Sequence, residues 1–305
     1  MLFSLKFSKI LTYFFLLLIL ITIFIFNNAA NAGALYGLNL WYDHMIPALF
    51  PFMLLSKIML KTGFASFLSS FFYPIVGKLF RISHYGVFVL IMGFLSGFPM
   101  AAQLVSSLIE EKNISKEEGE YLLLFCNNIG PMYLMGFLFP ICPFISLQFI
   151  LLVHFGVPLL YGLILRYTVY RNQIFVLNHF ERQNNMSLSD SLNQAMLPSL
   201  MGITNLGILM IVFNTLQMLV SHMLYAFPAE AKGILACLIE ITGGIHQISH
   251  DSRFYPLIYA LLHFGGICCI TQTIIFTKHC DFSTKKYVFH KIMQSILSGI
   301  IYYCI

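Results

Sequence analysis

The sequence predicts an all-α polytopic membrane protein with an inverted structural repeat and two re-entrant helical hairpins. Three observations support this fold class. Hydrophobic residues make up 59% of the 305 residues and charged residues only 10%, and the mean hydropathy is +0.83, as in membrane proteins. Apolar segments of about 20 residues, long enough to span a bilayer, alternate with short polar joints. Two of these segments are interrupted near the middle by glycine.

The first predicted element is the apolar run at residues 10–26, which follows Lys6 and Lys9. The sequence Ala-Asn-Ala at 30–32 resembles a signal-peptide cleavage site. However, the run has 17 residues, whereas the apolar core of a signal peptide has about 7–15. We therefore expect an uncleaved N-terminal transmembrane helix within residues 1–33, with cleavage as the alternative.

Further transmembrane helices are expected wherever apolar residues dominate for about 20 positions. We place them at 44–60, 120–140, 144–166, 201–221, 254–277 and 289–305. The stretches 64–80 and 188–199 carry apolar residues at helical spacing between polar ones, which predicts interfacial helices. The polar joint 168–187 is expected to be a cytoplasmic loop that divides the chain into halves.

The segment 85–109 is long and apolar enough to cross a membrane, but Ser96, Gly97, Phe98 and Pro99 interrupt it. In hydrocarbon, unpaired backbone groups are costly, so non-helical backbone survives only inside protein or beside a cavity. Secondary transporters build their binding sites from such broken helices. We predict a re-entrant hairpin whose tip binds a ligand through these four residues. The alternative is a kinked spanning helix.

The second half of the chain repeats this order of features. Residues 45–50 read Met-Ile-Pro-Ala-Leu-Phe, and residues 196–201 read Met-Leu-Pro-Ser-Leu-Met. Each is followed by a span and a glycine-broken segment, the second at 229–249 with Glu-Ile-Thr-Gly-Gly-Ile. A span interrupted by Asn-Asn-Ile-Gly-Pro or by His-Phe-Gly-Gly comes next. Three correspondences in the same order predict an internal repeat.

Basic residues give the orientation of the predicted spans. If the N-terminus is cytoplasmic and each hairpin returns to its own side, fifteen of the seventeen Lys and Arg lie inside and only Lys232 and Arg253 lie outside. The first hairpin then enters from the cytoplasm and the second from outside. The repeats, residues 34–167 and 188–305, are therefore inverted, an arrangement that supports alternating access about a midplane site.

Polar and small residues at the breaks are the candidate substrate-binding residues: Ser96, Gly97, Phe98, Pro99, Asn127, Asn128, Glu240, Thr242, Gly243, Gly244, His263, Gly265 and Gly266. Glu240 is the one acidic residue that lies away from the ends of a predicted membrane segment. It is expected to bind a proton, an ion or the substrate, or else to cap a half-helix. Asn127 and Asn128 bind a ligand or join two helices. His263 pairs with a carboxylate or packs between helices.

Several functions are unsupported. No Gly-x-Ser-x-Gly, P-loop or Ser-x-x-Lys pattern is present, so we expect no catalytic residue and no enzyme activity. The seven cysteines contain no Cys-x-x-Cys pair, and His246 and His250 lack the pattern of a zinc enzyme, so we expect neither a metal nor a cofactor. The net charge of +5 is spread in ones and twos beside apolar segments, so no nucleic acid partner is expected.

Four segments resemble the YlbJ/SpoVV family of sporulation integral membrane proteins: residues 38–52, 93–103 with Ser-Gly-Phe-Pro, 117–136, and 240–244 with Glu-Ile-Thr-Gly-Gly. That family belongs to the nucleoside-recognition (Gate) group and is distantly similar to the concentrative nucleoside transporters. The resemblance implies two Gate-like repeats. It also implies export of dipicolinic acid from the mother cell toward the forespore, across the mother-cell or outer forespore membrane. The chain departs from the family at Gln103, where a Lys is expected, and at Lys57, where an acidic residue is common.

The predicted function is transport or facilitated passage of a small carboxylate, dipicolinic acid by resemblance. Half-helix N-termini offer N–H donors and a partial positive charge to an anionic substrate, which a coupling proton or cation could accompany. One alternative is a non-transporting membrane scaffold in spore assembly, which needs no polar cavity. Another is a nucleoside-type transporter, but the first hairpin tip lacks the Gln-Ser/Thr-Glu run of that class. The lipid bilayer is the other expected partner. The sequence leaves open whether the protein forms a homo-oligomer.

Overall fold

The computed structural model describes residues 2–142, 146–175 and 186–304. Within these residues every regular element is helical, and no strand occurs. Five of the described helices are long and apolar enough to cross a membrane, or six if a bent pair counts as one span. The prediction of an all-α polytopic membrane protein is thereby confirmed. The predicted loop 168–187 lies partly outside the described residues.

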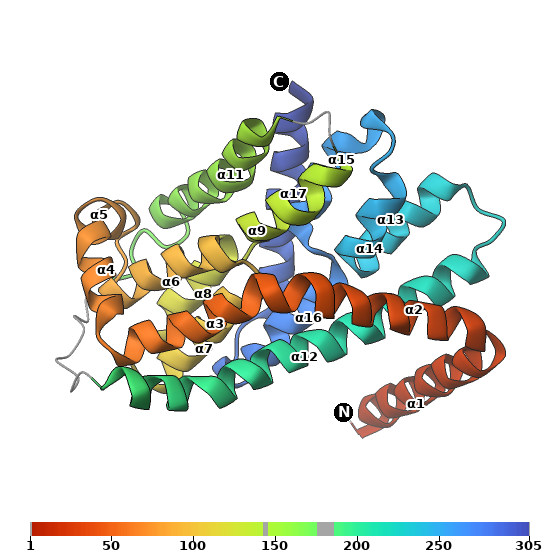
Figure 1. Ribbon diagram of the computed structural model, residues 1–305, viewed down its shortest axis with the longest axis horizontal. Helices are drawn as coiled ribbons and strands as arrows, with labels where there is room; N and C mark the ends of the chain where they lie inside the picture. Colours follow the sequence, from red (N-terminus) through yellow and green to blue (C-terminus); the bar gives the residue numbers. More distant parts are fainter. Residues whose placement is uncertain (1, 143–145, 176–185, 305) are drawn as a thin grey trace.

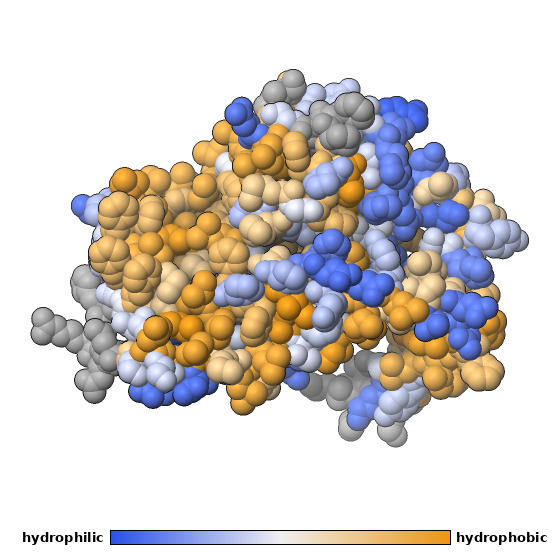
Figure 2. All heavy atoms as spheres, viewed as in Figure 1, coloured by the Kyte–Doolittle hydropathy of each residue, from blue (hydrophilic) through white to orange (hydrophobic). Residues whose placement is uncertain are grey.

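The N-terminal helix α1 (Leu2–Ile25) projects from the rest of the molecule (Figure 1). Its apolar side chains have few protein neighbours: Phe14 is 62% exposed and Phe24 is 84% exposed. A contiguous apolar surface of this kind marks contact with a membrane or a partner. The surrounding surface has the same character, because hydrophobic residues cover much of the face in Figure 2. Hydrophilic residues gather there at the edges and in a patch near the centre.

Two long helical rods lie side by side across the molecule (Figure 1). The first joins α2 (Asn27–Asn39), the π-helical turn η1 (Leu40–Met45) and α3 (Ile46–Lys61) into 35 residues, and the second is α12 (Leu188–Met223), with 36 residues. At about 1.5 Å per residue, each rod exceeds the roughly 30 Å thickness of a bilayer core. A rod of this length that spans a bilayer must be tilted or extend beyond it.

Glycines on the first rod allow this close packing. A Cβ atom on Gly33 would lie 2.7 Å from the carbonyl oxygen of Asn214, and one on Gly37 would lie 2.8 Å from that of Met210. Trp41 adds a hydrogen bond from its indole N–H to the carbonyl oxygen of Ile203, at 2.9 Å. The backbones of the two rods therefore lie close together, in addition to the contacts that their side chains make.

The interpretation of 188–199 as a separate interfacial helix is wrong, because α12 continues without interruption through Pro198. A proline inside a helix removes one backbone hydrogen bond and costs about 3 kcal/mol in isolation. Here α12 contacts α3 on both sides of the proline, because the Lys61 ammonium donates to the side-chain oxygen of Gln194 at 2.9 Å and the Ser199 hydroxyl donates to the carbonyl oxygen of Met53 at 3.3 Å. Packing against the first rod thus outweighs the local cost of Pro198.

The remaining helices form two groups in chain order. The first comprises α4 (Phe64–Phe72), η2 (Tyr73–Gly77), α5 (Lys78–Phe80), α6 (His84–Ser96), α7 (Met100–Glu110), α8 (Lys116–Cys126), α9 (Pro131–Tyr133), η3 (Leu134–Leu138), α10 (Phe139–Ile141) and α11 (Leu147–Tyr167). The second comprises α13 (Ala229–Ile239), α14 (Ile241–Ile248), η4 (Ser252–Phe254), α15 (Tyr255–Phe264), α16 (Gly266–Phe276), η5 (Lys278–Cys280) and α17 (Thr284–Cys304). Each group contains two short helices that meet at a break, then a longer broken helix.

Local sequence signals set several of these helix ends. Ser83 and Ser115 cap α6 and α8, since their hydroxyl oxygens accept N–H groups of Gly86 and Glu118 at 3.0 and 3.1 Å. The Glu118 carboxylate in turn accepts the N–H of Ser83 at 2.7 Å, which joins the two helix starts. The largest core cluster is built mainly by α6, α7 and α8. A rigid core therefore holds the first hairpin in place.

The predicted span 289–305 corresponds to α17, which is not among the five long apolar helices. Polar residues, including Lys291 and Gln294, lower its apolar character, and both are fully buried in the described structure. α17 packs against α15, α11 and α8. The helix therefore turns its polar side chains toward the protein, whereas apolar side chains on its other face, such as Phe289 and Ile300, are 55% and 54% exposed.

Candidate functional site

Four helix breaks meet in the interior of the molecule. They separate α6 from α7, α8 from α9, α13 from α14, and α15 from α16. The first two are joined by a hydrogen bond from the Phe98 N–H to the Asn128 carbonyl oxygen, at 2.7 Å. Gly97 has a φ of +80°, and a Cβ atom there would overlap the backbone nitrogen of Gly130. Only glycine suits this position, because it adopts positive φ without strain and has no side chain.

The α15–α16 break lies between the two predicted hairpins. A Cβ atom on Gly265 would lie 3.1 Å from the Phe98 ring, and one on Gly266 would lie 3.0 Å from the carbonyl oxygen of Cys237, at the end of α13. Both glycines have positive φ, +79° and +77°. The tips near Gly97 and Glu240 are thus brought together across a third broken helix.

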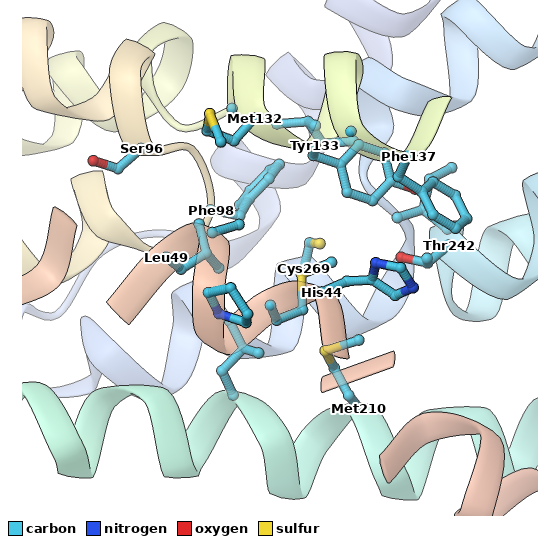
Figure 3. A pocket seen from close by; sticks show the side chains of 18 of the residues that line it. His44, Leu49, Ser96, Phe98, Met132, Tyr133, Phe137, Met210, Thr242 and Cys269 are labelled. Carbon is cyan, nitrogen blue, oxygen red and sulfur yellow. The ribbon is translucent and has the colours of Figure 1, made fainter. Parts of the chain in front are cut away.

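A cavity of about 260 Å³ opens between these breaks and the two long rods (Figure 3). Four of the predicted binding residues line it: Ser96 and Phe98 from the first hairpin, and Glu240 and Thr242 from the second. Lining residues that sequence reasoning did not identify include Asp43, His44, Leu49, Ile129, Tyr133, Phe137, Leu206, Met210, Cys269 and Gln272. Several of these come from the rods, where the sequence analysis predicted no break.

The other predicted binding residues are not part of the cavity lining: Gly97, Pro99, Asn127, Asn128, Gly243, Gly244, His263, Gly265 and Gly266. The glycines serve close packing of helices. A Cβ atom on Gly243 would lie 2.7 Å from the Gln217 side-chain oxygen of α12, and one on Gly244 would overlap the backbone of Cys237 in α13. These small residues therefore let α14 approach both neighbours.

Glu240 caps α14 in this structure. Its side chain is 3% exposed, and its two carboxylate oxygens accept the N–H groups of Thr242 and Gly243 at 3.1 and 2.9 Å. A carboxylate is stabilised there because the N-terminus of a helix carries a partial positive charge. The donors of α14 that were predicted to bind an anionic substrate are thus occupied by the protein's own carboxylate, which also lines the cavity.

His263, a residue of α15, lies outside the cavity lining and packs against α11. It is fully buried, with Nδ1 at 3.1 Å from the carbonyl oxygen of Tyr259 and Nε2 at 3.4 Å from that of His154. The two histidine rings are 4.7 Å apart between centroids. In this structure His263 occupies the helix-packing position rather than one facing a ligand.

Asn127 and Asn128 join α8 to other helices. The Asn127 amide N–H donates to the Thr273 hydroxyl at 2.8 Å and to the Tyr287 hydroxyl at 3.0 Å. The Asn128 side-chain oxygen accepts from Lys291 at 2.7 Å. The two amides thus connect the end of α8 to α16 and α17.

Lys291 is a residue that sequence reasoning missed. It is 0% exposed, and its ammonium also donates to the Asn127 carbonyl oxygen at 3.0 Å and lies 5.1 Å from the centre of the Phe98 ring. A signal for it was available. Lys291 lies within the predicted span 289–305, and an ionisable residue inside a membrane segment is a functional candidate by default.

The cavity is not basic. Its described lining includes the carboxyl groups of Asp43 and Glu240 and the imidazole of His44, but no Lys or Arg. Aromatic and aliphatic side chains make up most of the remaining wall, and Figure 3 shows Phe98, Tyr133 and Phe137 around the open space. The Ser96 hydroxyl points away from these rings (Figure 3). The site therefore offers mainly aromatic and aliphatic surface to a ligand, with a few polar groups.

The fold and this cavity define an all-α integral membrane protein whose interior site is assembled from broken helices. Over 131 residues the chain is 32% identical to the sporulation integral membrane protein YlbJ of Bacillus subtilis strain 168. This similarity confirms the predicted resemblance to that sporulation protein. The match covers 43% of this chain and spans about a third, 32%, of the relative's length. No protein-family model matches the chain, and a search of solved structures gave no significant match.

Proposed function

We propose that the protein is a membrane transporter or facilitator that moves a small carboxylate, dipicolinic acid in the first place, during endospore formation. The observation that carries the proposal is the cavity at the meeting point of four helix breaks. Non-helical backbone in a membrane is tolerated only where it is buried in protein or lines a cavity. A scaffold that only holds partners needs neither the breaks nor the cavity, so the site supports transport over that alternative.

The lining fits a flat aromatic acid. Phe98, Tyr133 and Phe137 offer ring faces and edges against which an aromatic ring packs favourably. The Thr242 hydroxyl and the His44 imidazole both line the cavity and provide hydrogen-bonding groups for a carboxyl substituent. An apolar wall with a few polar groups is the usual construction of a small-molecule site.

The carboxyl groups of the cavity require that the substrate be accompanied by a proton. A substrate carboxylate beside Glu240 would place two like charges in a buried site, and such a pair favours protonation of one member. If Glu240 takes the proton, the N–H groups of Thr242 and Gly243 become available to the substrate carboxylate. Glu240 and the substrate would thus exchange places at the N-terminus of α14 in each cycle.

Binding tests this proposal directly. Purified protein in detergent is titrated with dipicolinate, uridine or adenosine, and the thermal unfolding midpoint is followed, because a ligand that binds only the folded state raises it. We expect dipicolinate to raise the midpoint in a concentration-dependent way and the nucleosides to leave it unchanged. Stabilisation by the nucleosides alone would instead favour the nucleoside-type transporter. No stabilisation by any of the three would favour the scaffold.

A further inference from the structure

Lys291 is the one described lysine whose side chain is fully buried. No carboxylate of the described residues lies within ion-pair distance of its ammonium. A buried charge without a partner is costly unless hydrogen bonds and nearby dipoles compensate for it. The compensation available to Lys291 comes from the end of α8.

The last turn of α8 presents carbonyl groups that carry a partial negative charge and have no partner within the helix. Side chains from outside the helix satisfy several of them. Gln294 donates to the Leu124 carbonyl oxygen, and the Asn128 amide donates to that of Phe125 at 2.6 Å. Lys291 donates to the carbonyl oxygen of Asn127 at 3.0 Å.

The environment of the Lys291 ammonium is that of a bound cation. It contacts one backbone carbonyl oxygen and, at 2.7 Å, the side-chain oxygen of Asn128, and it lies over the face of the Phe98 ring. Oxygen atoms at the C-terminal end of a broken helix are also where cation-coupled carriers hold a free ion. Aromatic faces attract cations as well.

We infer that the ammonium of Lys291 occupies, at the α8–α9 break, the position that a bound monovalent cation would otherwise take. The wild-type protein therefore needs no free cation at this position. When the lysine side chain is removed, the same oxygen atoms form a binding site for a small primary ammonium ion. Lys291 is a positioning residue: through Phe98 it supports one wall of the cavity, and through Asn127 and Asn128 it holds the backbone at the break. This inference goes beyond the proposed function and does not depend on the substrate.

Chemical rescue tests the inference. The variant Lys291→Ala lacks a propylammonium group, so its thermal unfolding midpoint is measured in detergent with propylammonium chloride or with N-methylglucamine chloride at equal ionic strength. Lys286→Ala is the matched control, because Lys286 lies on the same helix but is only partly buried and is paired with Glu120 at 2.7 Å. We expect Lys291→Ala to lose at least about 5 °C and to recover most of that loss with propylammonium. The control should not respond to propylammonium. Absence of rescue, or an equal response of the control, would overturn the inference.

Two further measurements decide the matter if Lys291→Ala does not accumulate. Lys291→Met keeps the volume of the side chain but not its charge, so it should be destabilised and should not respond to propylammonium. The midpoint of the wild-type protein should be the same in sodium chloride and in N-methylglucamine chloride. A Lys291→Met variant as stable as the wild type, or a wild type stabilised specifically by sodium, would contradict the inference. Neither result depends on whether dipicolinate is transported.

Discussion

Replacing Glu240 by Gln separates its capping role from its proposed role in transport. The two carboxylate oxygens accept different N–H groups, at 3.1 Å from Thr242 and at 2.9 Å from Gly243. A glutamine keeps one oxygen as an acceptor, but its amide group cannot accept the second N–H. The variant therefore loses one hydrogen bond to a charged group, about 1.5–3 kcal/mol, and part of the interaction with the helix dipole, about 0.3–1 kcal/mol.

These losses predict a folded but weakened variant. With an unfolding entropy of about 2.1 cal/mol/K per residue, a destabilisation of about 2–4 kcal/mol corresponds to roughly 3–6 °C in the unfolding midpoint of a chain of 305 residues. Thermal unfolding in detergent measures this shift. Glu230→Gln is the matched control, because Glu230 lies in the first turn of α13 but is exposed. The control should lose far less stability than Glu240→Gln.

Transport by the same variant tests the proton-binding role. A glutamine cannot ionise, so Glu240→Gln should lose flux, or lose its dependence on pH, in liposomes that contain the correctly folded protein. Glu230→Gln should transport as the wild type does. Normal flux with a normal pH profile in Glu240→Gln would refute the exchange of Glu240 with the substrate and leave it as a helix cap.

Two further predictions concern the architecture around the cavity. Gly97→Ala should cost at least about 3 kcal/mol, because alanine is strained at a φ of +80° and its Cβ atom would overlap Gly130. Gly136→Ala should be nearly neutral in the same thermal unfolding assay, because nothing lies within 4 Å of a Cβ atom there. Trp41→Phe should lower the free energy of unfolding by about 1 kcal/mol, since it removes the indole hydrogen bond between the two rods. An unchanged unfolding midpoint in Trp41→Phe would show that this hydrogen bond does not hold the rods together.

Composition and segment length were sufficient to predict the fold class, since a membrane imposes the same constraint on every spanning helix. The positions of the breaks followed from local chemistry as well. The segment 85–109 corresponds to α6 and α7, and the segment 229–249 corresponds to α13 and α14. Whether these pairs enter the membrane from opposite sides stays a prediction, because the inverted repeat depends on a bilayer that orients the chain.

The cavity lining could not be predicted to the same extent. Which residue of a break faces the cavity depends on the rotation of short helices, and this is set by packing between elements distant in sequence. Phe98 faces the cavity and Gly97 does not, although they are neighbours. The contact of Lys291 with Asn128 joins residues 163 positions apart, and no local pattern records it. Likewise, no sequence signal distinguished the continuous helix at Pro198 from an ended one.

The central claim is that the cavity at the four helix breaks is part of a transport pathway. The most direct measurement is uptake of labelled dipicolinate by liposomes that contain the purified protein and no other, with protein-free liposomes as the control. We predict saturable uptake that excess unlabelled dipicolinate suppresses and uridine does not, and that an inward proton gradient accelerates. Uptake equal to that of protein-free liposomes, with protein shown to be folded and inserted, would contradict the account.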